Sequence, residues 1–191
     1  MRTVLLTSLM LLSTLQCTKK SESIDSASSV PKNFSTAEIE QLPLVSKTFK
    51  ESLLKEVATR MSTEGAAVAV SYCHEKALPL TDSIAQEHQL RIYRVSDKPR
   101  NSKNTPSSSE LALINYYKAK LLEGKKLKDS LSTGVYYSPL VTSGACLKCH
   151  GTPGTLSPKA LAVIKEKYPA DQATGYKEGE VRGLVVITPV P

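Results

Sequence analysis

The sequence predicts an α+β fold built around an antiparallel sheet. Apolar residues recur at helical spacing in several segments, and three shorter segments rich in β-branched and aromatic residues are typical of strands. The two kinds of segment do not alternate regularly enough for a series of βαβ units, so we expect antiparallel pairing. Residues 45–191 have the length of one ordinary domain.

The first half of this domain is predicted to be helical up to its first strand. Apolar side chains recur every four residues over 46–62 and predict an amphipathic helix. A second helical stripe runs over 66–77, and we expect Pro79 to break or restart that helix. The β-prone segment 91–96, with tyrosine and valine on one side, predicts the first strand.

The second half is predicted to combine two helices with two strands. The segment 98–106 contains two prolines and two asparagines and is expected to be a loop. Helices are expected at 109–124, which a serine can cap, and at 157–168, which opens with a serine–proline pair. Strands are expected at 134–140 and at 181–188, the latter containing a glycine.

The N-terminus has the pattern of an export signal. A single arginine precedes an apolar run that is too short to span a bilayer, so 1–16 is predicted to be a cleaved signal peptide. The residues that end at Cys17 resemble a bacterial lipoprotein cleavage box, which implies acylation of this cysteine. The acylated cysteine and a Ser- and Lys-rich flexible tether are assigned to 17–44. We therefore expect a bacterial lipoprotein of the periplasm or cell envelope, anchored to a membrane.

The most specific motif in the chain is Cys-Leu-Lys-Cys-His at 146–150. This pattern is the attachment signature of a c-type haem. The thiols of Cys146 and Cys149 can add to the two vinyl groups of one porphyrin, and His150 then becomes the proximal iron ligand. We expect one covalently attached haem c.

Other uses of this cysteine pair fit the sequence less well. Structural zinc needs four ligands, usually from two such pairs, and the chain contains no second pair. A thioredoxin-like redox motif belongs to a βαβ unit and does not require the histidine. A plain disulfide between the two cysteines is the third alternative.

The second axial ligand of the iron is less clearly indicated by the residues. Beyond the predicted signal, the candidates are Cys73, His74, His88 and Met61. Cys73 lies on the apolar stripe of its helix, whereas His74 is turned about 100° away and His88 lies at a polar helix end. A lone cysteine on such a stripe is also commonly just a small buried apolar residue. Geometry favours Cys73 and leaves His74 as the alternative.

The formal charge of +7 at neutral pH indicates a basic surface. Outside the cytoplasm we expect no nucleic acid, and an anionic lipid surface, an acidic redox partner protein or a merely solvated surface remain as explanations. Arg94, Lys98 and Arg100 lie close together at a strand-to-loop exit and are candidate partners for the haem propionates. Such residues are also commonly solvated loop charges.

Several runs taken together resemble a family of single-haem c-type proteins with a PAS-like fold. The runs are 66–73, 94–106, 137–140 with 146–151, 168–171 with 175–176, and 179–183. The resemblance covers nearly the whole domain and implies a His/Cys-ligated haem, carried over here onto His150 and Cys73. Ser102 departs from the pattern, because proline usually follows the Arg-Asn pair. The family includes exported single-domain proteins and sensor modules of histidine kinases.

These features predict a membrane-tethered cytochrome that acts in electron transfer or redox response. A thiolate opposite an imidazole adds negative charge to the iron, so we expect a low reduction potential. The alternative is a haem-based sensor of redox state or of a diatomic ligand that signals through a separate partner. An enzyme such as a peroxidase is disfavoured, because the chain has three histidines and one of them is the predicted proximal ligand.

Overall fold

The computed structural model describes residues 33–190, and the predicted signal 1–16 and acylation site Cys17 lie outside them. Within the described part the fold is α+β, with one four-stranded antiparallel sheet in the order β1-β4-β3-β2. The strands are β1 (Leu90–Val95), β2 (Ser130–Ser132), β3 (Val135–Val141) and β4 (Val181–Pro189). The predicted fold class and antiparallel pairing are confirmed.

Strand β4 runs through the middle of the sheet and is buried on both faces. Val185 and Ile187 point to one face, where they pack with Phe49 and Ile92. Leu184 and Val186 point to the other face and pack against Ile114. Because successive side chains of a strand alternate between faces, this uninterrupted apolar run contributes to two separate cores.

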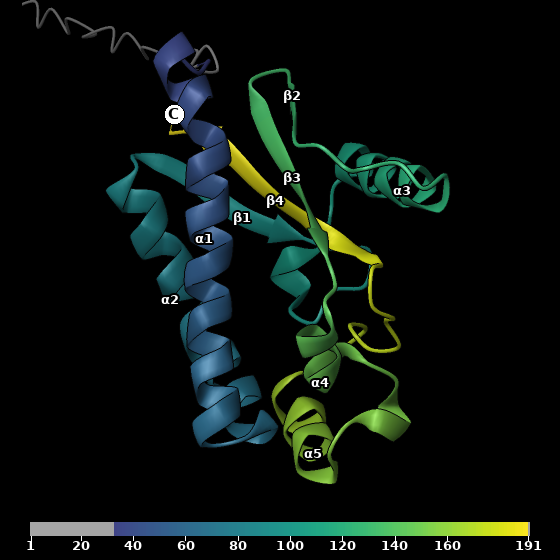
Figure 1. Cartoon of the computed structure of the whole chain (residues 1–191). Coiled ribbons are helices and arrows are strands. Elements are labelled where there is room, and N and C mark those ends of the chain that lie inside the picture. Colours follow the sequence, from purple (N-terminus) through teal and green to yellow (C-terminus); the bar gives the residue numbers. More distant parts are fainter. Residues whose placement is uncertain (1–32, 191) are drawn as a thin grey trace, which may run out of the picture.

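Helices cover both faces of the sheet (Figure 1). Helices α1 (Thr36–Thr63) and α2 (Ala66–Glu87) pack side by side on one face, and α3 (Ser108–Leu122) packs on β4 from the other. Helices α4 (Leu147–His150) and α5 (Pro158–Lys167) lie beyond one end of the sheet, where they meet the first half of α2. The predicted motif at 146–150 is therefore held between α2, α5 and the end of the sheet.

Helix α1 begins ten residues earlier than the predicted start at 46, so the end of the predicted tether is wrong. Ser35 and Glu38 form a reciprocal capping box, and Pro43 lies inside the helix. Leu42 and Val45 are buried in the core, and this burial offsets the hydrogen bond that the proline removes. Tertiary packing thus makes 36–44 part of the folded domain.

Helix α2 runs through Pro79, and the predicted break there is wrong. An internal proline costs a helix about 3 kcal/mol because it loses one hydrogen bond and crowds the preceding turn. Ala77 and Thr81 are buried on either side, and the Thr81 hydroxyl donates to the Ala77 carbonyl oxygen at 2.7 Å. Packing of both halves against α1 and β1 keeps the helix continuous.

The remaining boundaries agree with the predictions to within about two residues, and β2 was missed because its three residues carry no periodic signal. In the described part of the chain, no helix has the length and apolar content needed to cross a membrane.

Gly183 of β4 lies in close contact with the end of β1. A Cβ at this position would overlap the carbonyl oxygen of Val95 and come within 3.1 Å of the Ser96 Cα. We expect Gly183→Ala to lower the free energy of unfolding by about 1–3 kcal/mol, because backbone cannot yield as a flexible side chain can. Urea denaturation would measure the loss. Gly154→Ala is the control, since its Cβ would meet nothing within 4 Å; equal stability of both variants would contradict the expectation.

Candidate functional site

The motif forms a single compact turn at the end of the sheet. Cys146 ends a short 3-10 helix, and Cys149 and His150 belong to α4. Cys149 is buried in a cluster with Val70 of α2 and Ile164 of α5. Helical geometry over these five residues brings both thiols and the imidazole to one small region, as attachment of a flat macrocycle requires.

The imidazole of His150 is held in one tautomer. Its Nδ1 lies 2.7 Å from the carbonyl oxygen of Ala173, which can only accept, so Nδ1 carries the proton. Burial lowers the pKa of His150 well below its usual value, and the charges of Arg182 and Arg100 lower it further. The ring is therefore neutral, and Nε2 keeps its lone pair for a metal ion.

Cys73 is brought next to the motif. It is half-buried on α2, and burial raises the pKa of its thiol while Arg94, Arg100 and Arg182 oppose that rise. Burial raises the pKa of the Cys149 thiol as well, Arg100 opposes that rise, and the nearby Cys73 adds to it. A sulfur on a neighbouring helix thus accompanies the histidine of the motif.

The other candidate axial ligands are placed differently. His74 is exposed and sets its ring edge-on against Tyr168, with the centroids 5.0 Å apart. His88 caps α2 fifteen residues beyond Cys73, a distance of about 20 Å along a helix. Met61 is partly buried and packs against the cluster that contains Cys149. Of the two predicted alternatives, Cys73 has the more enclosed position.

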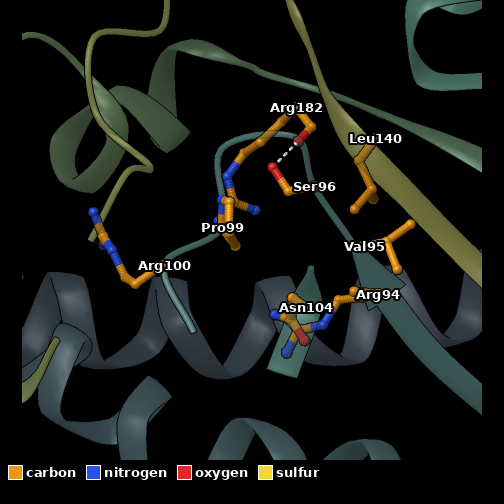
Figure 2. Close-up of a pocket in the computed structure, with 8 residues that line it drawn as sticks. All are labelled: Arg94, Val95, Ser96, Pro99, Arg100, Asn104, Leu140 and Arg182. Atoms are coloured by element: carbon orange, nitrogen blue, oxygen red, sulfur yellow. Dashed lines mark hydrogen bonds between the residues drawn. The ribbon is translucent and has the colours of Figure 1, made fainter. Parts of the chain in front are cut away.

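A pocket beside the motif is lined by three arginines. Figure 2 shows Arg94, Arg100 and Arg182 around it, with Arg100 directed away from the other two. Burial lowers the pKa of Arg182 to about 10, and the charge of Arg94 adds to this effect. The Nε atom of Arg182 is buried without a hydrogen-bond partner. Among residues 33–190, neither Arg94 nor Arg182 takes part in an ion pair.

The donor set fits a ligand that combines a metal ion with carboxylates. Buried cations without counter-ions cost free energy, and an anionic group in the pocket would remove that cost. His150 and Cys73 offer a nitrogen and a sulfur. In the described part of the chain, no three His, Cys, Asp or Glu side chains converge into a set for a bare metal ion.

Comparisons with known proteins show the family and the fold of this chain. A family model described as Tll0287-like matches residues 14–189. The chain belongs to the Tll0287-like family. The crystal structure of the cyanobacterial heme-protein Tll0287 is similar with a TM-score of 0.62 and 19% sequence identity, over 83% of this chain and 97% of that one. This likeness shows a shared fold. No curated protein matches in sequence.

In this Tll0287-like chain, two of the three cations predicted for propionates already have protein partners. Arg100 pairs with Asp171, with Nε and Oδ1 3.0 Å apart, and both side chains are buried. Lys98 donates to the carbonyl oxygen of Thr174 at 2.6 Å and lies over the ring of Tyr176. Arg94 alone of the three has no such partner among the described residues.

Arg182 is the site residue that the sequence reasoning missed. It is the one charged residue in the predicted strand 181–188, where the other side chains are apolar or small. A cation at the start of a buried strand needs a partner, and this signal was available. Asp171 and Ala173 could not be found in this way, since their roles depend on a loop that folds back onto α4.

Proposed function

We propose that the chain carries one haem c, attached through Cys146 and Cys149 and ligated by His150 and Cys73. The observation that carries the proposal is the buried, neutral imidazole of His150, whose Nδ1 donates to the carbonyl oxygen of Ala173 and leaves Nε2 available for a metal ion. The heme-protein named in the structural comparison supports the same cofactor class.

When bound, the haem supplies one-electron redox chemistry. The residues of the chain then have separate tasks. Cys146 and Cys149 would fix the macrocycle covalently, and His150 and Cys73 would both ligate the iron, which would favour electron transfer over substrate chemistry. A Cys73 thiolate would stabilise the oxidised state and keep the reduction potential low. We therefore propose an electron carrier or redox-responsive cytochrome with a PAS-like fold, and no enzymatic activity.

The cellular setting is part of the same proposal. A signal over 1–16 and acylation of Cys17 would anchor the protein to a bacterial membrane in the periplasm or cell envelope. There it would exchange electrons with a partner protein whose identity the chain does not indicate. The tether would end near residue 35, because α1 begins at Thr36.

The first prediction concerns the axial sulfur. Protein matured in cells that attach c-type haem should gain the mass of one haem, which Cys146→Ala/Cys149→Ala should lose. Ferric Cys73→Ala should lose the low-spin electron paramagnetic resonance signal of a thiolate ligand, because alanine offers no donor atom. His74→Ala is the matched control and should keep that signal. An unchanged signal in Cys73→Ala would exclude this residue as the ligand.

A second prediction concerns the propionates, which we assign to Arg94 and Arg182. In Arg182→Gln a propionate loses a buried cation, so its pKa rises. The reduction potential should then fall at neutral pH and become more positive as the pH drops below about 6, since protonation removes a negative charge. Protein-film voltammetry across pH would measure this effect, and Arg94→Gln should behave alike.

Two controls separate this assignment from general charge effects. Arg91→Gln removes an exposed arginine from the same strand as Arg94, and Lys98→Gln removes the lysine held by Thr174. Both should keep the wild-type pH profile. If Lys98→Gln alone altered the profile, Lys98 would be the propionate partner and the assignment to Arg182 would be wrong.

The sensing alternative has one structural argument of its own. Cys73 comes from the long helix α2, which packs against α1, β1 and α5. Release of Cys73 from the iron could therefore shift α2 and change its packing against these three elements. Carbon monoxide added to the reduced protein distinguishes the two functions. An electron carrier should bind carbon monoxide poorly, because two protein ligands would already hold the iron. Rapid binding, recorded by the visible spectrum, would favour the sensor.

A further inference from the structure

Arg100 and Asp171 form a buried ion pair next to the motif. Nε of Arg100 lies 3.0 Å from Oδ1 of Asp171 and Nη2 lies 3.3 Å from Oδ2, so the contact is two-pronged. The side chains are 9% and 8% exposed, in contrast to the Lys47–Glu51 pair on α1, where both are mostly exposed. Salt and water therefore screen the Arg100–Asp171 pair only weakly.

The pair holds both the motif and the peptide that supports His150. Nη2 of Arg100 donates to the carbonyl oxygen of Cys149 at 2.7 Å and makes a longer contact of 3.4 Å to the carbonyl oxygen of Ala173. Oδ1 of Asp171 accepts from the Ala173 amide at 3.0 Å. The Ala173 carbonyl oxygen is the acceptor for Nδ1 of His150. The same ion pair thus contacts both sides of the interaction that orients the imidazole.

Backbone hydrogen bonds join the same segments. The amides of Gly175 and Tyr176 donate to the carbonyl oxygens of Gly151 and His150, at 2.8 and 3.0 Å. The amide of Gln172 donates to the carbonyl oxygen of Pro99, next to Arg100. The loop over 171–176 is therefore fixed between the segment after β1 and the end of α4, with the ion pair at its first residue.

From these contacts we infer that Arg100 and Asp171 are a positioning pair that fixes the proximal imidazole and sets the electrostatic environment of the iron. The inference rests on the proposed haem function. Neither residue needs to touch the iron, because both act through the Ala173 peptide and the Cys149 carbonyl. The charges around His150 then divide into two groups: Arg100 is neutralised by Asp171, while Arg94 and Arg182 remain for an anionic ligand.

The pair is neutral as a unit, so removing either member leaves a buried charge of opposite sign. Asp171→Asn leaves the Arg100 cation uncompensated, which stabilises the reduced iron and makes the potential more positive. Arg100→Gln leaves the Asp171 anion uncompensated and makes the potential more negative. A purely structural loosening would not reverse its sign between the two variants.

The experiment uses matured holoprotein of the wild type, Arg100→Gln, Asp171→Asn and the double variant. Voltammetry should show opposite shifts for the single variants, and the neutral double variant should return toward the wild-type potential. Glu51→Gln is the control for a broken exposed pair and should show no shift. Shifts of the same sign, or none, in variants that carry normal haem would overturn the inference.

Hydrogen exchange followed by mass spectrometry tests the positioning role separately. The peptide that spans 168–176 should exchange faster in Asp171→Asn, because the Ala173 amide loses its charged acceptor. Arg100→Lys keeps the charge and loses the two-pronged geometry, so it should keep a potential near wild type while 168–176 exchanges faster. Unchanged exchange in both variants would refute positioning. If wild type carried no haem, the proposed function would fail while the exchange result still tested the pair.

Discussion

The hydrogen bond from Nδ1 of His150 to the Ala173 carbonyl oxygen is the interaction on which the site depends. It selects the tautomer of the imidazole and ties the motif on α4 to a loop more than twenty residues later. That loop in turn is held by the side chain of Arg100, which contacts Asp171 and Ala173, and by the carbonyl oxygen of Pro99; both residues follow β1. The orientation of the His150 imidazole therefore depends on three segments that are distant in sequence: α4, the loop after α5 and the segment after β1.

The charges around this interaction are unevenly matched. Asp171 neutralises Arg100, and among the described residues no carboxylate forms an ion pair with Arg94 or Arg182. Leaving cations buried in this way is costly unless a ligand brings negative charge into the site. The fold thus combines a neutral pair on the side of His150 with a cationic pocket beside it, and this division suits a cofactor that carries both a metal ion and carboxylates.

Elements with strong local signals could be predicted from the sequence, and the exceptions have physical causes. The strand at 181–188 and the helices at 109–124 and 157–168 were placed to within about two residues, since periodicity and caps are local. The predicted helix break at Pro79 was wrong because the burial of Ala77 and Thr81 outweighs the local free-energy cost of a proline. Among the site residues, Lys98 and Arg100 lay near Arg94 in sequence, but their partners come from the loop after α5 and could not be foreseen.

By itself the sequence determined the Cys-Leu-Lys-Cys-His motif and the α+β class, because each is encoded in spacings of a few residues. Only the tertiary structure decided that Cys73 lies near Cys149, which arginines lack ion-pair partners, and how Asp171 and Ala173 support the ring. These outcomes depend on contacts between α2, α4, β1, β4 and the loop after α5. Burial and electrostatic pairing arise only when those elements pack together, so they cannot be predicted from a local sequence pattern.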